Sequence, residues 1–330
     1  MRNTTVYVAD EGPPVANAIA WFASSKYQAE YVCRLTISER GLSDDQRDIQ
    51  DRIISPREIM DLCNATPFVT DVTLRGLDVA LEGPFAQDAP MGPDTVHSLT
   101  IASPAIEVTL PAVASVATRF RNLQTLNIEG PDGQLDSVSM AHLQHYLRRR
   151  DLPIRELRVK RSGVDQLDGI NVLLRKTAST LRHLSIELFP TPQLHYEILG
   201  PVRADLTGLH QLRELDVYIP ILGYTSGYDP SAHLSPARDM LRSIPKRVEE
   251  VHVVFWNECD TRGAFIKAMA RFPVRALLAP LLRVQVKITF TAGTQGSSAT
   301  DRAAHWGHIL ERSRTWRETC EELRPTLTLA

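Results

Sequence analysis

One spaced apolar pattern recurs along most of this chain and limits the folds that are open to it. The pattern is an apolar residue, any two residues, a second apolar residue, any one residue and a third apolar residue. Nine copies occur, and their first positions lie 27 to 37 residues apart. They are Val32-Leu35-Ile37, Val69-Val72-Leu74, Val96-Leu99-Ile101, Leu123-Leu126-Ile128, Ile154-Leu157-Val159, Leu181-Leu184-Ile186, Leu212-Leu215-Val217, Val248-Val251-Val253 and Leu281-Val284-Val286. A period of this length predicts that one supersecondary unit is stacked many times.

Each copy predicts a short strand with one buried face. The last two apolar residues are separated by one position, and successive side chains of a strand point to opposite faces. The position between them is polar in LQTLNI at 123–128, LRHLSI at 181–186 and LRELDV at 212–217. We therefore expect one face of every strand to be solvated.

Helical segments are expected between the strands, at residues 46–62, 137–150, 164–178, 260–272 and 299–323, with Pro56 interrupting the first. Alternation of strand and helix about every 30 residues is compatible with a closed (β/α) barrel, a doubly wound sheet or an open solenoid. A parallel strand of a barrel is buried on both faces and is apolar throughout. The polar alternate positions therefore favour the open solenoid, and a (β/α) enzyme is the less favoured alternative.

Strands of the form LxxLxL at these periods resemble leucine-rich repeats, over roughly Tyr31 to Ile288. The segment Phe22–Ile37 is similar to the stretch that introduces the repeats of fungal-type F-box/LRR proteins, and Tyr31–Ile37 matches its first strand. The resemblance implies an α/β leucine-rich-repeat horseshoe of about nine irregular repeats. Residues 1–30 would form a helical lead-in or cap, 31–290 the solenoid, and 291–330 a capping helix and tail. The asparagine or cysteine that usually follows LxL is absent, since Pro131, Phe189 and Pro220 stand there in three copies.

The same resemblance implies a non-catalytic protein-recognition module, similar to the substrate-receptor part of an F-box-type ubiquitin-ligase adaptor. No F-box-like motif occurs in residues 1–30. A ubiquitin-ligase linker subunit is therefore expected as a partner only if an F-box is encoded upstream. The alternative is a free-standing scaffold without any connection to ubiquitin.

A partner is expected on the concave face, because the residues between and beside the last two apolar positions of each copy point there. The predicted partner-binding residues are Asn127, Arg158, Lys160, Ser185, Glu187, Glu214, Asp216, Tyr218, Glu250 and His252. The central row is predicted to end on Gln285. Acidic residues dominate the later copies, which favours a basic protein ligand.

Charge and motif content exclude several other functions. Lys and Arg number 37 and Asp and Glu 39, so the net charge of −2 gives no bulk attraction to nucleic acid or to an anionic membrane. No nucleotide-binding or common hydrolase motif occurs, and the pairs His142/His145 and His305/His308 are interpreted as surface histidines. We therefore expect no enzyme activity, cofactor or metal. Four scattered cysteines and the lack of a signal peptide predict a cytoplasmic or nuclear protein.

Overall fold

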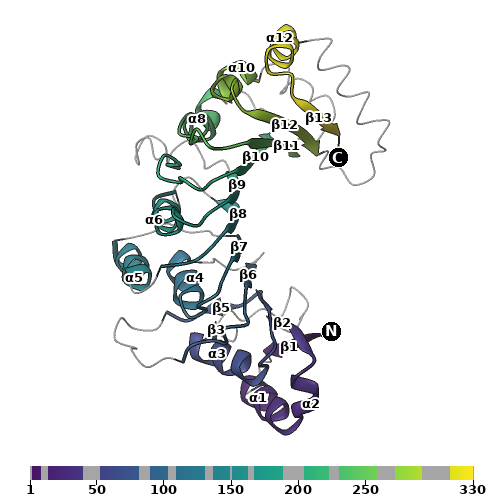
Figure 1. Ribbon diagram of the computed structural model, residues 1–330, viewed down its shortest axis with the longest axis vertical. Coiled ribbons are helices and arrows are strands. Elements are labelled where there is room, and N and C mark those ends of the chain that lie inside the picture. Colours follow the sequence, from purple (N-terminus) through teal and green to yellow (C-terminus); the bar gives the residue numbers. More distant parts are fainter. Residues whose placement is uncertain are drawn as a thin grey trace. The chain divides into compact units, whose positions relative to one another are not determined.

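Strands and helices alternate along the chain, as the repeat predicts (Figure 1). The computed structural model describes residues 2–8, 14–39, 53–81, 90–102, 109–130, 137–148, 151–162, 167–188, 204–222, 230–258, 272–291 and 313–329. The strands are β1 (Arg2–Val8), β2 (Val32–Glu39), β3 (Ile53–Ile54), β4 (Asp71–Arg75), β5 (Asp78–Val79), β6 (Ser98–Ala102), β7 (Thr125–Glu129), β8 (Glu156–Ser162), β9 (His183–Leu188), β10 (Glu214–Leu222), β11 (Glu250–Glu258), β12 (Gln285–Thr291) and β13 (Thr326–Leu329). The helices are α1 (Pro14–Ser24), α2 (Lys26–Ala29), α3 (Pro56–Ala65), α4 (Leu110–Ala117), α5 (Ser137–Arg148), α6 (Leu167–Thr177), α8 (Pro230–Arg242), α10 (Val274–Leu278), the 3-10 turn η4 (Ala279–Leu281) and α12 (Arg314–Leu323).

The chain divides into two compact units, each with a parallel sheet. Unit 1 comprises Met1–Arg161 and Arg175–Leu181, and unit 2 comprises Ser162–Leu174 and Arg182–Ala330. The strand order in unit 1 is β1-β2-β4-β6-β7-β8. In unit 2 it is β9-β10-β11-β12-β13. Short strands β3 and β5 form a separate parallel pair. The fold is therefore mixed α/β with parallel strands.

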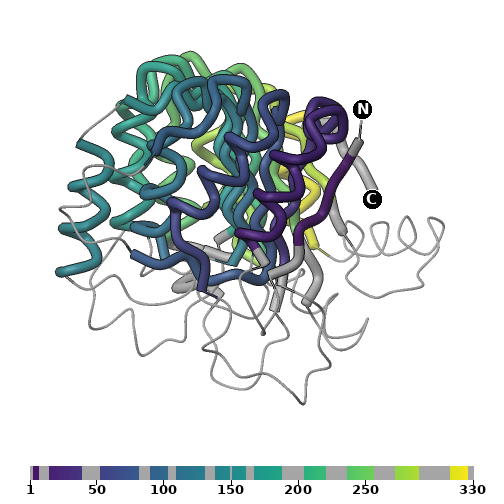
Figure 2. Tube along the Cα trace, turned by 90° about the horizontal axis from the view of Figure 1, so that it is seen from below, coloured from purple at the N-terminus to yellow at the C-terminus, as the bar shows by residue number. Residues whose placement is uncertain are grey.

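The apolar positions of the repeat form the core. Leu126 and Ile128 of β7 are 0% and 1% exposed, and Leu215 and Val217 of β10 are both 0% exposed. The burial of β4, β6 and β7 alternates residue by residue, which confirms one buried and one accessible face for these strands. In unit 1 the helices α3, α4 and α5 lie on one face of the sheet (Figure 1). Figure 2 shows the purple to blue coils of unit 1 stacked along one side of its strands.

Helices occur at several of the expected places. The structure confirms the helices expected at 137–150 and 164–178 as α5 and α6. Pro56 does not interrupt a helix but begins α3, where Ser55 and Glu58 form a capping box. Proline suits this position because the first turn of a helix needs no amide donor. The helix expected at 260–272 lies almost wholly outside the described residues, and of 299–323 the structure describes only the part that contains α12.

The two edge strands were not predicted. The lead-in expected to be helical, residues 1–30, contains α1 and α2 but starts with β1, which pairs in parallel with β2. The tail likewise ends in β13, which pairs with β12. Neither edge strand carries the full repeat pattern. Their signal is weaker: a run rich in threonine, valine and tyrosine in one, and alternating threonine and leucine in the other.

The ninth copy of the pattern is displaced by two residues from its expected register. The pattern aligns Val284 and Val286 with the buried pair of β11, but the structure pairs Val286 with Val251 and places Ile288 opposite Val253. Lys287, rather than Gln285, therefore stands beside His252. Apolar residues alternate from Val284 through Phe290, so alternation alone fits both registers.

Candidate partner-binding face

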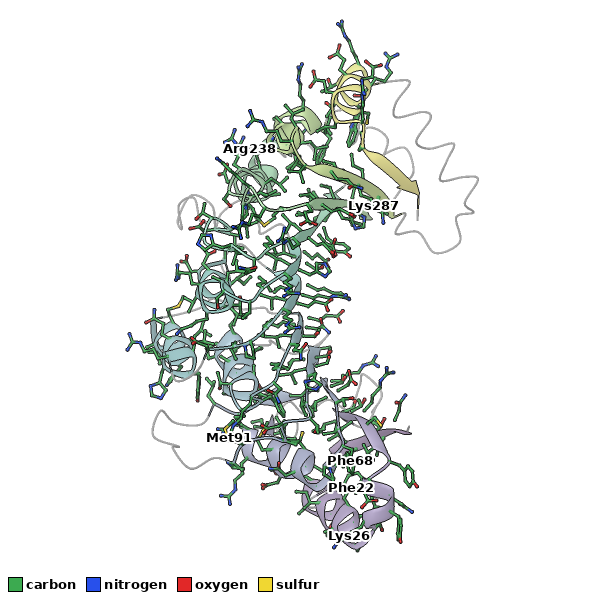
Figure 3. All side chains as sticks on the ribbon, in the orientation of Figure 1. Phe22, Lys26, Phe68, Met91, Arg238 and Lys287 are labelled. Atoms are coloured by element: carbon green, nitrogen blue, oxygen red, sulfur yellow. The ribbon has the colours of Figure 1, made fainter. Side chains whose placement is uncertain are left out.

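The register of unit 2 arranges the residues that alternate with the core positions of four strands in three rows, which we call the polar face of unit 2. Ser185, Glu187, Val254 and Thr289 of these rows are buried. From β9 to β12, the first row is His183, Glu214, Glu250 and Gln285. The central row is Ser185, Asp216, His252 and Lys287, and the third row is Glu187, Tyr218, Val254 and Thr289. Figure 3 labels Lys287 on this sheet and Arg238 in the helix layer. On each strand the residues of these rows alternate with the buried apolar residues of the motif. The spacing of the motif therefore determines which residues belong to the polar face.

A continuous chain of polar contacts crosses the polar face diagonally from β9 to β12. His183 Nε2 lies 2.9 Å from Asp216 Oδ2, and His252 Nδ1 lies 3.5 Å from Asp216 Oδ1. On its other side, His252 Nε2 lies 2.7 Å from the hydroxyl oxygen of Thr289. We call these four residues the polar chain.

Proton positions in the polar chain follow from its carboxylate. An ionised carboxylate can only accept hydrogen bonds, so the histidine nitrogens that face Asp216 carry the protons. In a neutral His252 the proton is then on Nδ1, and Nε2 accepts a hydrogen bond from the Thr289 hydroxyl. Asp216 thereby fixes both ring orientations.

The same contacts control the charge of Asp216. Burial raises the pKa of this carboxyl, but hydrogen bonds and positive charge from His183 and His252 outweigh burial, so its pKa lies well below its usual range. Asp216 therefore stays negative throughout the neutral and mildly acidic range.

Two further carboxylates lie side by side on the polar face. Glu214 and Glu250 are paired in register on β10 and β11, and Glu214 is exposed while Glu250 is partly exposed. Neither has a cationic partner in the part of the chain that the structure describes. Like charges on neighbouring strands destabilise a sheet, by up to about 1 kcal/mol. Such a pair gains from a cation supplied by another molecule.

The other predicted residues of the polar face of unit 2 differ in accessibility. Tyr218 and His252 are partly exposed, as is Asp216. Ser185 and Glu187 are only 6% and 7% exposed, so the two residues predicted on β9 are largely closed to a partner. The sequence could not indicate this, because both occupy the same motif positions as their accessible neighbours.

The predicted residues of unit 1 form a separate polar surface on β7 and β8. Asn127 and Arg158 are paired in register, and the Asn127 amide donates a 3.1 Å hydrogen bond to the Thr100 hydroxyl. Arg158 is engaged by Glu156 of its own strand, at 2.8 Å. Lys160 is exposed and has no acidic partner among the described residues. Glu129 stands opposite Lys160 in the register, so two acids and two bases share this surface and its charge is balanced.

Hydroxyl, imidazole and carboxylate follow one another from Thr289 to Asp216, in the order that nucleophilic hydrolases use. Thr289 is, however, only 6% exposed, and its hydroxyl is held by His252. A nucleophile must reach a substrate carbonyl, so this geometry favours a structural role for the threonine.

Metal and membrane binding also receive no structural support from the described residues. Within these ranges no group of three or more His, Cys, Asp or Glu side chains could hold a metal ion. His142 and His145 lie on α5, whereas His305 and His308 fall outside the described residues. No helix in the described part of the chain combines the length and apolar character needed to cross a bilayer.

Comparison with known proteins finds likenesses among solved structures. The leucine-rich repeat-containing protein LegL7 from Legionella pneumophila is similar over 94% of this chain and 98% of its own, with 13% sequence identity and a TM-score of 0.43. No family model matches the chain, and no curated protein matches it. The resemblance to fungal-type F-box/LRR proteins therefore stays a prediction from the sequence.

Proposed function

We propose that this chain is a non-catalytic recognition module of the leucine-rich-repeat type, and that the polar face of unit 2 binds a basic segment of a protein partner. The observation that carries the proposal is the adjacent pair Glu214 and Glu250, accessible and without a cation of its own. Asp216 adds a third negative charge that is held in place by its histidines.

The polar face suits a peptide for a further reason. Its groups stand on neighbouring strands with fixed register, so their positions are set before a ligand arrives, which lowers the entropic cost of binding. A lysine or arginine side chain placed between Glu214 and Glu250 would form charge-assisted hydrogen bonds and remove the repulsion between them.

Selection from a random peptide library on the purified protein tests this proposal. We expect the peptides recovered on the wild type to be enriched in lysine and arginine, and the variant Glu214→Lys/Glu250→Lys to lose that enrichment. The control Glu30→Lys/Glu321→Lys changes the net charge equally at two exposed residues that do not belong to the face. Loss of enrichment in both variants would show that only overall charge matters, and unchanged selection on the first variant would remove this face as the binding site.

The more specific role is the substrate-receptor part of an F-box-type ubiquitin-ligase adaptor, in the cytoplasm or nucleus. Its support is the resemblance of Phe22–Ile37 to the segment that introduces the repeats of such proteins. Mapping the 5′ end of the native transcript tests it. An in-frame upstream exon encoding an F-box-like helical module would support the adaptor, whereas a transcript that starts at Met1 would favour the free-standing scaffold.

A further inference from the structure

A second charged surface of unit 2 lies away from the polar face, where α8 ends. The turns that precede β10 and β11 enclose a hollow of about 470 Å³. Thr207 and His210 line it from the first turn, and Arg242, Ser243, Lys246 and Arg247 from the second. The Ser243 hydroxyl accepts a 3.1 Å hydrogen bond from the Leu206 amide and donates a 2.8 Å bond to the Met240 carbonyl, so it holds the two turns together.

The hollow carries a surplus of positive charge. Lys246 and Arg247 are exposed, and neither has an acidic partner among the described residues. Arg242 lies 3.3 Å from Asp239, but Asp239 also contacts Arg238 at 3.4 Å, so one carboxylate is shared between two arginines.

Two further carboxylates lie in these turns, Glu249 and Asp205. Glu249 pairs with Arg213, and Asp205 accepts hydrogen bonds from the Thr207 amide and hydroxyl at 3.0 and 2.7 Å. Three carboxylates, Asp205, Asp239 and Glu249, thus stand against five cations, Arg213, Arg238, Arg242, Lys246 and Arg247, which leaves a surplus of two positive charges around the hollow.

The helix end does not account for all of these cations. Positive side chains in the last turn of a helix favour its dipole, and Arg242 at the end of α8 has that role. The effect falls off within one turn. Lys246 and Arg247 belong to a later turn, which the Val248 amide closes by a 3.1 Å hydrogen bond to the Pro245 carbonyl.

We propose that this hollow binds a phosphate monoester. Its size falls within the range of about 300–1,000 Å³ for small-molecule sites, and its lining combines the cations Arg242, Lys246 and Arg247 with hydroxyl groups and with the apolar Ile244 and Pro245. Arginine guanidinium groups match phosphate oxygens two at a time, and lysine adds a mobile point charge. The ester is carried either by a phosphorylated protein side chain or by a small phosphorylated molecule, and one experiment separates these sources.

Fluorescence polarisation with a labelled peptide that contains one phosphoserine among glycine and alanine tests the proposal, at about 0.15 M ionic strength where long-range attraction is screened. Its unphosphorylated twin and glycerol phosphate are the comparison probes. We expect the wild type to bind the phosphopeptide or glycerol phosphate, and not the twin. Lys246→Glu/Arg247→Glu should weaken that binding at least about tenfold, since it replaces charge-assisted contacts by repulsion.

The matched control is Lys26→Glu/Arg121→Glu, which changes net charge equally at exposed residues of unit 1. Arg121 is a suitable comparison because it occupies the corresponding turn before β7. Binding by the control should stay within about twofold of the wild type, as expected for independent sites. Circular dichroism verifies that both variants are folded.

The outcomes separate clearly. Phosphopeptide binding that is much tighter than glycerol phosphate binding supports a phosphorylated protein as the source, and equal affinities support a small molecule. The proposal is overturned if neither probe binds, if the unphosphorylated twin binds equally well, or if the control variant loses as much affinity as Lys246→Glu/Arg247→Glu.

Discussion

Replacing Asp216 by asparagine should destabilise the protein, because the polar chain depends on its charge. Asparagine keeps the shape but offers one acceptor oxygen, so it can satisfy only one of the two histidines. The 2.9 Å contact with His183 is a charge-assisted hydrogen bond, a class that contributes about 1.5–3 kcal/mol. The His252 contact, at 3.5 Å, is weaker, and Asp216 is 22% exposed. We therefore expect Asp216→Asn to cost about 2 kcal/mol at pH 7.

Urea unfolding followed by circular dichroism measures this cost, from the shift in midpoint at constant m-value. Glu214→Gln is the control on the same strand, two residues away. It removes a like charge beside Glu250 and should leave stability unchanged or raise it, by up to about 1 kcal/mol. A cost below about 0.5 kcal/mol for Asp216→Asn, or an equal cost for the control, would refute the role of the polar chain.

The pH dependence of the Asp216→Asn cost follows from the lowered pKa of Asp216. In the unfolded chain a typical aspartate has a pKa of about 3.9, and in the folded protein the pKa of Asp216 lies below its usual range. The contribution to stability is therefore complete above about pH 4 and is lost as the pH falls towards the folded pKa, by at most about 1.4 kcal/mol per unit. Urea titrations from about pH 4.5 to 3, below the range in which histidines titrate, should show the difference between wild type and variant decreasing as the pH falls below about 4. A difference that persists unchanged to pH 3 would contradict the assignment.

Three further substitutions or reactions test the packing of unit 1. Gly92→Ala should lower the urea midpoint by the equivalent of about 1–3 kcal/mol, because a Cβ would lie 2.3 Å from a ring carbon of the buried Phe120; a neutral effect would show that the ring can move. Ser55→Ala should cost about 1 kcal/mol in the same assay by removing the capping box of α3, and no loss would mean that the cap is dispensable. Burial raises the pKa of Cys63 to about 12, so a thiol reagent at pH 8 should label partly exposed Cys33 first and Cys63 only on unfolding; rapid native labelling of Cys63 would contradict its burial.

The repeat pattern predicted the interior strands and their two faces because both depend only on alternation. Leu126 and Ile128 are buried, and Asn127 between them is partly exposed, as LQTLNI predicts. The pattern could not reveal β1 or β13, which pair at an edge without its three apolar positions.

The sequence predicted which residues belong to the candidate site, but not which of them contact one another. Glu214, Asp216, Glu250 and His252 share the polar face of unit 2 as expected. Asp216 differs from Glu214 because it contacts two histidines, His183 and His252. The contact with His183 joins residues of different rows, so it depends on the register of the strands as well as on the motif. His183 and Thr289 could not be assigned to the polar chain from spacing, because their partners lie 33 and 37 residues away.

The polar chain also distinguishes between alternative alignments of β12. A slip by one residue would turn Val286 and Ile288 outward and is excluded by the hydrophobic effect. A slip by two residues keeps every apolar residue inside, so burial does not oppose it. In that alternative register Lys287 would take the place of Thr289. A hydroxyl can donate to the unprotonated Nε2 of His252 and accept from a protonated Nε2, whereas an ammonium can only donate and would repel a protonated ring. One threonine hydroxyl thus favours a single alignment of a strand whose hydrophobic pattern permits two.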